Sequence, residues 1–542
     1  MKHPDPEKMD DGVLDHRGEA LPYLSKSAKN MKMDKLLSTP MPNFEGETPG
    51  SYFWTKVIYW ICHKISKIQF RSIEATGMEK IPLDRGSLCC AWHTNGLLDA
   101  LQITLNHPRY FVFGGRHDLV TRPILGWWTR RMAVQPVVRK AELLRGGCSE
   151  EEASFLNGRS LMTLASGISH GYGCVLFPEG TSHNNAYMLR FRTGPMRTIL
   201  AASALAKASG KQLPVLIPIG LHFRTREYFR TDVWVEFSEP IQVQDDDVPD
   251  DLVNAVVDGT WSEPPADAVF KLRDNLREKL VPLTPNVHNW DEHRGLLLLG
   301  HIKGRLNNNQ PKSWQDEVVL GRQFRDRFTT KLTTEPNESL QPLKLTNPSL
   351  DKSKTAAGIL HHNGLDGRDL NGDATDLSSP KVAKLPLAVA RSSLFIVLLP
   401  IFIISLLPQM VLGRVLGDST DEGIDARTSY QFLAAMFGSI IIWPISSTII
   451  VSLMYWQSGQ ITEVIGFEWF ESFGNSPYNV AFAVIMTWFL MFPLSLFSGK
   501  LFSLVWDDIV DLRGFYRKQR MTNHDKKELF KLIAELKQEL SN

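Results

Sequence analysis

The sequence is poor in cysteine and has no excess of charge of either sign, and each absence excludes a class of protein. Its 542 residues include five cysteines with no Cys-X-X-Cys spacing, so we expect reduced thiols in a cytosol-like compartment, without a disulfide framework or a zinc site. Lys and Arg together number 60 against 59 Asp and Glu, which leaves a net charge of +1 and no field that would recruit nucleic acid. The first residues also lack the apolar stretch of a secretory signal, so we expect no cleaved signal peptide.

Aromatic residues are missing from one long internal stretch. No Phe, Trp or Tyr occurs from Thr329 to Leu394, although aromatic residues form 10% of the chain. A polar segment without aromatic anchors predicts a flexible tether over residues 331–385. Residues 1–48 are similarly polar and are predicted to be a disordered N-terminal arm.

Residues 49–70 have the pattern of an amphipathic helix. One helical face carries Trp54, Val57, Ile58, Ile61, Ile65 and Ile68, with the lysines largely elsewhere. Aromatic and apolar residues opposite lysines suit a helix that lies in a membrane interface. A helix that caps the following domain has the same pattern, so both interpretations stay open.

Short apolar runs alternate with helical stretches over residues 71–250. The candidate strands are residues 87–92, 110–114, 133–138, 174–177, 215–220 and 233–237. Helical stretches such as 158–170 and 196–208 lie between them. This alternation predicts an α/β fold with a mostly parallel sheet flanked by helices. Residues 251–330 are predicted to form a helical extension of this domain.

Long apolar segments follow within residues 386–506. They cover residues 392–412, 430–455 and 478–499 without a formal charge, and about 20 such residues suffice to cross a hydrocarbon core of roughly 30 Å as a helix. The sequence therefore predicts a transmembrane region of about three helices, with a lipid bilayer as partner. Residues 507–542 are predicted to be a basic amphipathic tail that is either solvated or rests on lipid.

The basic residues around these segments conflict with three full membrane crossings. They are Lys381, Lys384 and Arg391 before the first segment, and Arg513, Arg517, Lys518, Arg520, Lys526 and Lys527 after the last. Both groups favour the cytoplasmic side, which three crossings cannot satisfy. Either one segment is re-entrant, or the stretch GFEWF near Ile465 dips into the membrane, or the charge rule fails here. We expect a multi-pass protein whose active site faces the cytosol.

The stretch WHTNGLLD, from Trp92 to Asp99, holds the first candidate catalytic pair. An apolar strand leads into a turn that carries His93, and Asp99 follows six residues later at the start of a predicted helix. A carboxylate there can accept a hydrogen bond from Nδ1 of His93, which leaves Nε2 available as the general base for a hydroxyl proton. Taken alone, such a pair is more often a surface histidine beside a helix N-terminal aspartate.

Two further stretches supply groups that suit a phosphate. FPEGTS, residues 177–182, ends a strand in a Pro-Glu-Gly turn, where the backbone and the Glu179 carboxylate can approach a ligand closely. Arg139 ends an upstream strand, and Arg190 and Arg192 follow the turn. Guanidinium groups form forked contacts with phosphate, although any single arginine of this kind is more often a solvated surface residue.

The order of these motifs resembles a known family. WHTNGLLD, PVVR, FPEGTS and LIPIG follow one another over residues 92–220, and this ordered set is similar to the four motifs of the PlsC-like glycerolipid acyltransferases. His93 and Asp99 are separated by five residues, whereas most members have four. The longer spacing resembles the fungal-type glycerol-3-phosphate and dihydroxyacetone-phosphate acyltransferases.

The stretch after the Glu-Gly turn both supports the resemblance and departs from it. Ser182 and His183 in this place are similar to the fungal-type branch, whereas the family usually has Arg where Ser182 stands. Arg190 or Arg192 is expected to supply the missing cation, with Arg192 nearer to the family's basic residue before Gly.

The resemblance implies a PlsC-like domain that moves a fatty acyl group from a thioester to a hydroxyl of glycerol 3-phosphate or dihydroxyacetone phosphate, early in phospholipid synthesis. His93 would remove the hydroxyl proton, and Asp99 would orient and stabilise the imidazolium. The substrate-binding residues implied by the same motifs are Arg139, Glu179, Gly180, Thr181, Arg192 and Pro218. The donor would be acyl-CoA or acyl-carrier protein, used as a co-substrate, with no resident cofactor and no metal.

Other functions stay open at this point. Within the same class, the acceptor could be a lysophospholipid such as 1-acylglycerol 3-phosphate. In another class, the chain could be a membrane scaffold that keeps the fold without turnover, although the intact His93, Asp99 and Glu179 disfavour this. A transporter is disfavoured because the apolar segments contain no charged residue that could serve as an ion site.

Overall fold

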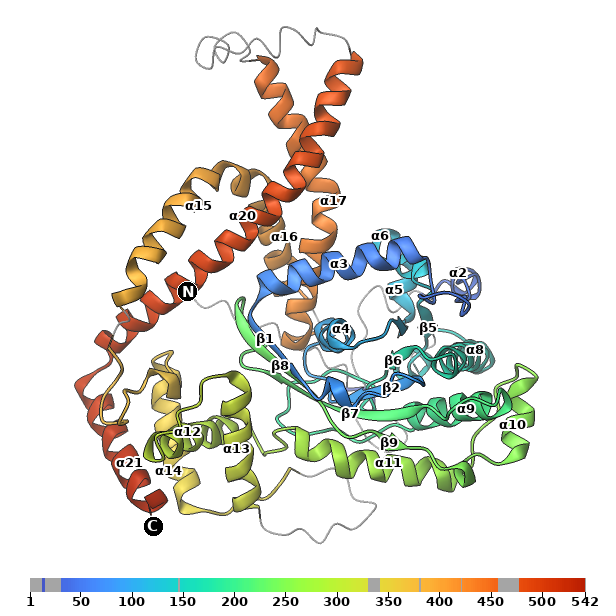
Figure 1. The fold of residues 1–542 in the computed structure, drawn as a ribbon, viewed down its shortest axis with the longest axis horizontal. Helices are drawn as coiled ribbons and strands as arrows, with labels where there is room; N and C mark the ends of the chain where they lie inside the picture. Colours follow the sequence, from blue (N-terminus) through green and yellow to red (C-terminus); the bar gives the residue numbers. More distant parts are fainter. Residues whose placement is uncertain are drawn as a thin grey trace.

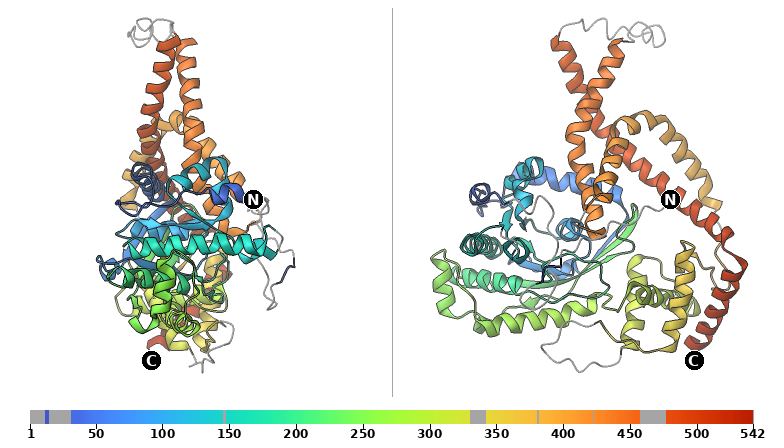
Figure 2. Two further views of the ribbon diagram at one scale, coloured as in Figure 1. Left: turned by 90° about the vertical axis from the view of Figure 1, so that its right-hand side faces the viewer. Right: turned by 180° about the vertical axis from the view of Figure 1, so that it is seen from behind.

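The computed structural model describes residues 12–14, 31–144, 147–329, 342–379, 382–420, 422–456 and 477–541. The chain forms an α/β body, a helical bundle beside it, and two long helices, α17 (Ile424–Trp456) and α20 (Pro477–Arg520), that project from the body (Figure 1). Figure 2 shows from two further sides that this pair extends well beyond the body and the bundle.

The body contains the sheet that positions the site. Its strands are β1 (Phe70–Thr76), β2 (Ser87–Ala91), β3 (Phe111–Val112), β6 (Gly173–Val175), β7 (Val215–Phe223), β8 (Thr231–Phe237) and β9 (Ile241–Gln242). Their order is β1-β8-β7-β2-β6-β3, with β9 beside β7. Most neighbours are parallel, while β7 runs antiparallel to β8 and β9. The predicted α/β fold with a mostly parallel sheet is confirmed.

Several strands differ from the sequence-based expectation, and the short strands β4 (Gly114–Arg116) and β9 were not predicted. The edge strand β1 was not predicted, because it is mostly half-buried and mixes Arg71, Ser72 and Glu74 among its apolar residues, which weakens the strand pattern. The predicted strand 133–138 is shorter, as β5 (Gln135–Val137), and it pairs with β4 (Gly114–Arg116) in a separate small sheet.

Helices cover both faces of the sheet. They are α2 (Met33–Leu37), α3 (Tyr52–Gln69), α4 (Leu97–Asn106), α5 (His117–Thr121), α6 (Pro123–Arg131), α7 (Lys140–Leu144), α8 (Glu150–Ser169), α9 (Gly194–Ala208), α10 (Asp250–Val257) and α11 (Ala266–Leu280). α9 and α11 lie on one face, and α4 with α3 lies on the other (Figure 1). Every residue of the central strand β2 is buried, as expected for a parallel strand covered on both faces. A capping box between Ser149 and Glu152 starts α8.

A helical bundle replaces most of the predicted tether. The bundle consists of α12 (Trp290–Leu306), α13 (Trp314–Phe328), α14 (Pro348–His362) and α21 (Asn523–Ser541). Helix α14 packs on α12 through small and aliphatic residues, among them Leu350, Ala356 and Leu360, which are buried. The tether prediction is therefore wrong for residues 342–379. Lack of aromatic residues does not prevent packing where alanine and leucine supply the contact surface.

The C-terminal tail also belongs to this bundle. Leu529, Ile533 and Leu536 of α21 are fully buried against α12 and α14, and Lys303 Nζ donates to the Leu540 carbonyl at 2.8 Å. Both expectations for the tail, solvated or resting on lipid, are wrong for this helix. Its amphipathic pattern is that of a helix whose apolar stripe faces a protein core.

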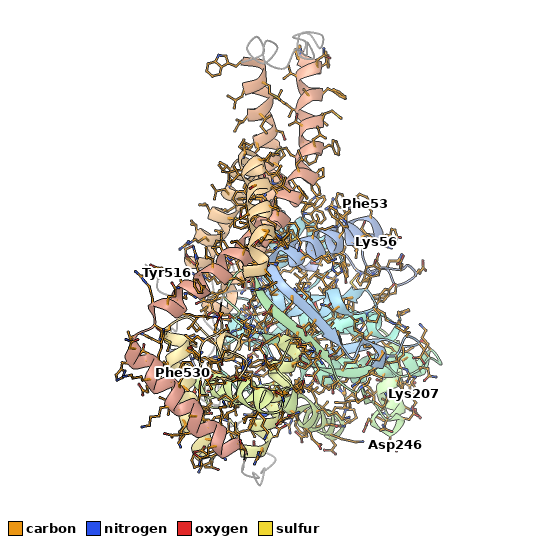
Figure 3. All side chains as sticks on the ribbon, turned by 60° about the vertical axis from the view of Figure 1, so that its left-hand side comes forward. Phe53, Lys56, Lys207, Asp246, Tyr516 and Phe530 are labelled. Carbon is orange, nitrogen blue, oxygen red and sulfur yellow. The ribbon has the colours of Figure 1, made fainter. Side chains whose placement is uncertain are left out.

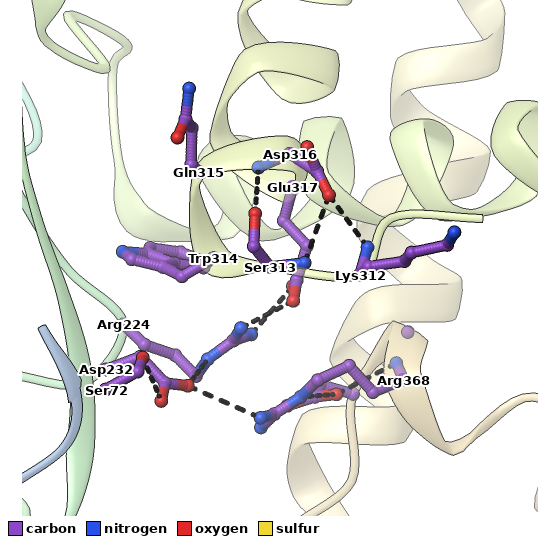
Figure 4. A network of polar contacts seen from close by, with 12 residues as sticks. Ser72, Arg224, Asp232, Lys312, Ser313, Trp314, Gln315, Asp316, Glu317 and Arg368 are labelled. Carbon is purple, nitrogen blue, oxygen red and sulfur yellow. Dashed lines mark hydrogen bonds and ion pairs between the residues drawn. The ribbon is translucent and has the colours of Figure 1, made fainter. Parts of the chain in front are cut away.

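An ion-pair network joins the bundle to the sheet (Figure 4). The Arg224 guanidinium, after β7, donates to Asp232 Oδ2 of β8 at 2.7 Å and to Glu317 Oε2 of α13 at 2.7 Å. Arg368 approaches the same Asp232 carboxylate at 3.6 Å. Burial by itself would raise the pKa of Glu317, but hydrogen bonds from Arg224 and His301 outweigh burial and hold that pKa at about 2. This buried ion-pair network thus fixes the bundle on the body.

The N-terminal arm is partly ordered. Among residues 31–48, helix α2 buries Leu36 completely in a cluster with Val138, Ala153 and Leu156, and Phe44 stacks on His170 with ring centroids 5.1 Å apart. The prediction of a disordered arm is wrong for this part, since these few apolar residues are enough to dock it.

Among the residues that the structure describes, three helices are long and apolar enough to cross a membrane: α15 (Leu385–Ser405), α17 and α20. The prediction of about three such helices is confirmed. The expected segment 392–412 is divided, because a new helix, α16 (Leu407–Asp418), begins after Leu406 with Pro408 in its first turn, where proline is favoured. The GFEWF stretch near Ile465 lies outside the described residues.

Helix α3 caps the domain with one face. Ile58 and Cys62 are buried in a cluster with Leu98 of α4 and Phe432 of α17, which confirms the capping interpretation. Phe53, by contrast, is 62% exposed, and Figure 3 shows it on the side of the body from which α17 and α20 rise. Contact of this outer face with a membrane interface stays a prediction.

Candidate active site

His93 and Asp99 lie together where β2 leads into α4. Gly96 makes the turn with a φ of 49°, in the left-handed region that favours glycine, and α4 starts at Leu97, so Asp99 sits in its first turn. The Nδ1 atom of His93 is 2.9 Å from Asp99 Oδ2. The Asp99 side chain is 0% exposed, and that of His93 is 18% exposed. The pairing predicted from the sequence is therefore present, with the histidine on the solvent side.

The Asp99 carboxylate also holds the loop between the two residues. Its Oδ2 atom accepts from the backbone N–H of Thr94 and of Asn95, each at 2.7 Å. With Nδ1 directed at this carboxylate, Nε2 is the nitrogen available as acceptor. The His93 ring stacks on Phe177 with centroids 3.9 Å apart and planes 7° apart, which fixes the direction of Nε2.

Glu179, in the FPEGTS stretch, contacts the WHTNGLLD stretch rather than solvent. Its Oε2 atom accepts from the His93 backbone N–H at 2.7 Å, while Oε1 accepts from the Leu189 N–H at 2.6 Å and pairs with His183 Nε2 at 2.8 Å. The side chain is 0% exposed. This arrangement makes Glu179 a residue that positions His93, and its direct contact with a substrate stays a prediction.

The turn after β6 brings the other predicted residues close to Glu179. Gly180 has a φ of 72° and is exposed, and a Cβ there would lie 3.4 Å from Arg192 Cγ. The Arg192 N–H donates to the Pro178 carbonyl at 2.6 Å, and Thr181 is half-buried beside this turn. The backbone and Cγ of the exposed Arg192 thus lie next to the Pro-Glu-Gly turn. Its contact with a phosphate stays a prediction.

Arg139 and Pro218 are placed less directly. Arg139 forms an ion pair with the buried Glu142, at 2.6 Å between Nη2 and Oε1. Pro218 is buried in β7 and pairs in register with Cys90 of β2. Pro218 therefore lies beside the strand that delivers His93, and the substrate contacts predicted for both residues stay predictions.

Arg226 is a site residue that the sequence did not reveal. Its Nη1 atom donates to the carbonyls of Thr94, at 2.8 Å, and His183, at 3.3 Å, so one guanidinium joins the loop after His93 to the loop after Glu179. Burial lowers the pKa of Arg226, and the carboxylates of Glu227 and Asp99 oppose this effect. Arg226 lies in the connection between β7 and β8, outside any motif, so no spacing pointed to it.

The fold and this geometry define the class of the domain. The Acyltransferase family profile matches residues 72–221, which contain the sheet, the His93–Asp99 pair and the Glu179 turn. This part of the chain therefore matches an acyltransferase domain.

Two comparisons with individual proteins accompany this match. Glycerol-3-phosphate O-acyltransferase 2 of Saccharomyces cerevisiae (strain ATCC 204508 / S288c) is 30% identical over 155 residues, which are 28% of this chain and 19% of the relative. The match therefore spans about a fifth of the relative's length. The crystal structure of the 1-acyl-sn-glycerophosphate (LPA) acyltransferase PlsC from Thermotoga maritima is similar over 40% of this chain and 79% of that chain, with 17% identity and a TM-score of 0.27.

Proposed function

We propose that this protein is a membrane-bound acyltransferase that moves a fatty acyl group from acyl-CoA to a hydroxyl of glycerol 3-phosphate or dihydroxyacetone phosphate, early in phospholipid synthesis. The observation that carries the proposal is the His93–Asp99 pair at 2.9 Å, with the half-buried imidazole aimed by Phe177 and by the Glu179 contact to its backbone. The longer spacing of the pair and the glycerol-3-phosphate acyltransferase relative support this choice of acceptor.

The mechanism uses His93 as a general base. Nε2 takes the proton of the acceptor hydroxyl as its oxygen bonds to the acyl carbon, the carbon–sulfur bond breaks, and the proton passes to the leaving thiolate. Asp99 stabilises the imidazolium that forms between these steps. The acyl group passes directly from donor to acceptor, so acyl-CoA acts as a co-substrate and no resident cofactor is required.

The paired helices α15 and α16 support a cytosolic active site. Arg391 near the start of α15 pairs with Asp508 of α20 at 3.3 Å, and at the bend Ser405 and Ser495 are hydrogen-bonded at 2.9 Å. Helix α16 then returns beside α17, with Arg427 and Asp418 paired. We propose that α15 and α16 form a re-entrant pair and that α17 and α20 cross the membrane, which leaves both basic flanks and the catalytic domain on the cytosolic side.

One assay tests the function. The full chain, purified into lipid nanodiscs, is offered acyl-CoA with glycerol 3-phosphate, dihydroxyacetone phosphate or lysophosphatidate, and free CoA thiol is measured. We expect turnover with at least one of the first two acceptors and its loss in His93→Ala. Turnover with lysophosphatidate alone would overturn the acceptor, and no CoA release with any acceptor would favour the scaffold alternative.

Orientation is tested separately in sealed microsomes. A protease added outside is expected to digest residues 71–330, and protection of this segment would overturn the cytosolic placement.

A further inference from the structure

The loop between His93 and Asp99 is covered by the first turns of the membrane helix α17. The Thr428 hydroxyl donates to Asn95 Oδ1 at 2.6 Å, and the N–H of Leu97 donates to the Ser429 hydroxyl at 3.0 Å. Thr428 is 1% exposed and Asn95 is 0% exposed. A Cβ at Gly96 would come within 2.7 Å of Ser429 Oγ. The helix and the loop are therefore in direct contact with no room for a larger residue at the turn.

Other contacts fix the start of α17 in this place. Before the helix, Glu422 accepts from Arg116 Nη2 at 3.0 Å. Burial by itself would raise the pKa of Glu422, but the charge and hydrogen bond of Arg116 outweigh burial and hold this pKa below its usual value. One turn after Ser429, Phe432 is buried beside Leu98 of α4. The Thr428 and Ser429 contacts are thus part of a packed joint.

These hydroxyls act on the catalytic pair through the backbone of the loop. The N–H of Asn95 is one of the donors that hold Asp99 Oδ2, the same oxygen that faces His93 Nδ1. When the Asn95 side chain is anchored, its N–H stays aimed at Asp99, and the direction of the His93 ring follows. Loss of the anchor leaves a buried amide oxygen without its donor and frees the loop to move.

We propose that Thr428 and Ser429 are positioning residues of the acyltransferase site, so that a membrane-spanning helix completes the catalytic loop. The proposal rests on the proposed acyl transfer. Helix α17 is both a predicted membrane crossing and a support of the His93 loop. The catalytic geometry of His93 and Asp99 therefore depends on the correct placement of α17.

The test compares Thr428→Val and Ser429→Ala with matched changes further along the same helix. Thr448→Val and Ser447→Ala are the controls, since these hydroxyls bond to carbonyls of α17 itself, those of Pro444 and Trp443, both at 2.9 Å. All variants are full chains in nanodiscs, assayed for kcat and for the KM of acceptor and acyl-CoA.

We expect each test variant to lower kcat about 10- to 100-fold with both KM values within about threefold, and the controls to stay within about twofold of the wild type. Thr428→Ser keeps the hydroxyl and is expected to restore most of the activity. If Thr428→Val fails to fold, as judged by its thermal midpoint, Thr428→Ser and Ser429→Ala carry the comparison.

Unchanged kcat in the test variants, an equal loss in the controls, or a rise in KM at constant kcat would each overturn the positioning role. These results differ from failure of the proposed function, which appears as absence of turnover in the wild type and overturns both proposals.

Discussion

Asp99→Asn tests the catalytic pair with little change in volume. Asparagine can still accept from the backbone N–H groups of Thr94 and Asn95 through its single oxygen, so the loop is expected to stay folded. Because Asp99 Oδ2 faces His93 Nδ1 as well as these two N–H groups, the amide oxygen in the same place keeps the hydrogen bond to the imidazole. What the substitution removes is the negative charge that stabilises the imidazolium.

The size of the effect follows from the geometry. At the observed 2.9 Å between Nδ1 and Oδ2, attraction between a carboxylate and an imidazolium is about 6 kcal/mol at an effective dielectric constant of roughly 20. The site is partly open, since His93 is 18% exposed, so we expect about 4 to 6 kcal/mol of lost transition-state stabilisation. This corresponds to a drop in kcat of about 10³- to 10⁴-fold, similar to the roughly 10⁴-fold effect of the same exchange in Ser-His-Asp hydrolases.

The assay is CoA release by the full chain in nanodiscs, with kcat and KM measured for the active acceptor. Asp247→Asn is the control, because Asp247 is also buried and ion-paired, with Lys271 at 2.8 Å, but lies outside the site. A folded Asp99→Asn variant with kcat within tenfold of the wild type would refute the His–Asp mechanism.

Three further changes test the surroundings of the site. Glu179→Gln is expected to lower kcat about 10- to 100-fold, because an amide cannot accept from both the His93 N–H and His183; CoA release measures this. Glu317→Gln is expected to lower the thermal unfolding midpoint, since removing one partner of the buried pair with Arg224 costs about 3 to 5 kcal/mol, while CoA release at 20 °C changes little. His222, whose pKa burial lowers to about 4, stays neutral in the folded chain at pH values where the unfolded chain binds a proton. Stability should therefore rise from pH 4 to about 6.5, and His222→Gln should flatten this rise by about 3 kcal/mol, as followed by thermal unfolding at each pH.

Each of these changes has an exposed counterpart as control: Glu151→Gln, Glu263→Gln and His288→Gln. Wild-type kcat in Glu179→Gln would show that this contact does not position the base. An unchanged midpoint in Glu317→Gln would show that the network does not hold the bundle, and an unaltered pH slope in His222→Gln would assign the slope to other groups.

The catalytic pair was predictable because its geometry is local. A strand, a turn and a helix start lie within the few residues from Cys90 to Asp99, so spacing alone places the carboxylate near the imidazole. The role of Glu179 was not predictable in the same way. The sequence shows a carboxylate in a Gly-containing turn, which suits a ligand, and only the structure places both of its oxygens against protein donors and out of solvent.

Composition led to wrong predictions for the tether and the tail, where the packing surfaces are small. The polar, aromatic-free stretch after Thr329 contains α14, whose alanines and leucines pack on α12. The basic tail contains α21, whose apolar stripe packs on α12 and α14. A stripe of this kind has one pattern whether it meets lipid, water-exposed neighbours or a core, so its partner is a tertiary property.

The sequence by itself determined the acyltransferase motifs and the apolar helices, since both depend on the order and hydropathy of nearby residues. Only the tertiary structure decided that these two parts meet, through Thr428 and Asn95, which are 333 positions apart, and that Arg226 joins the loops around the pair. The physical reason is that a hydrogen bond acts over about 3 Å in space, and folding alone sets which distant residues come that close.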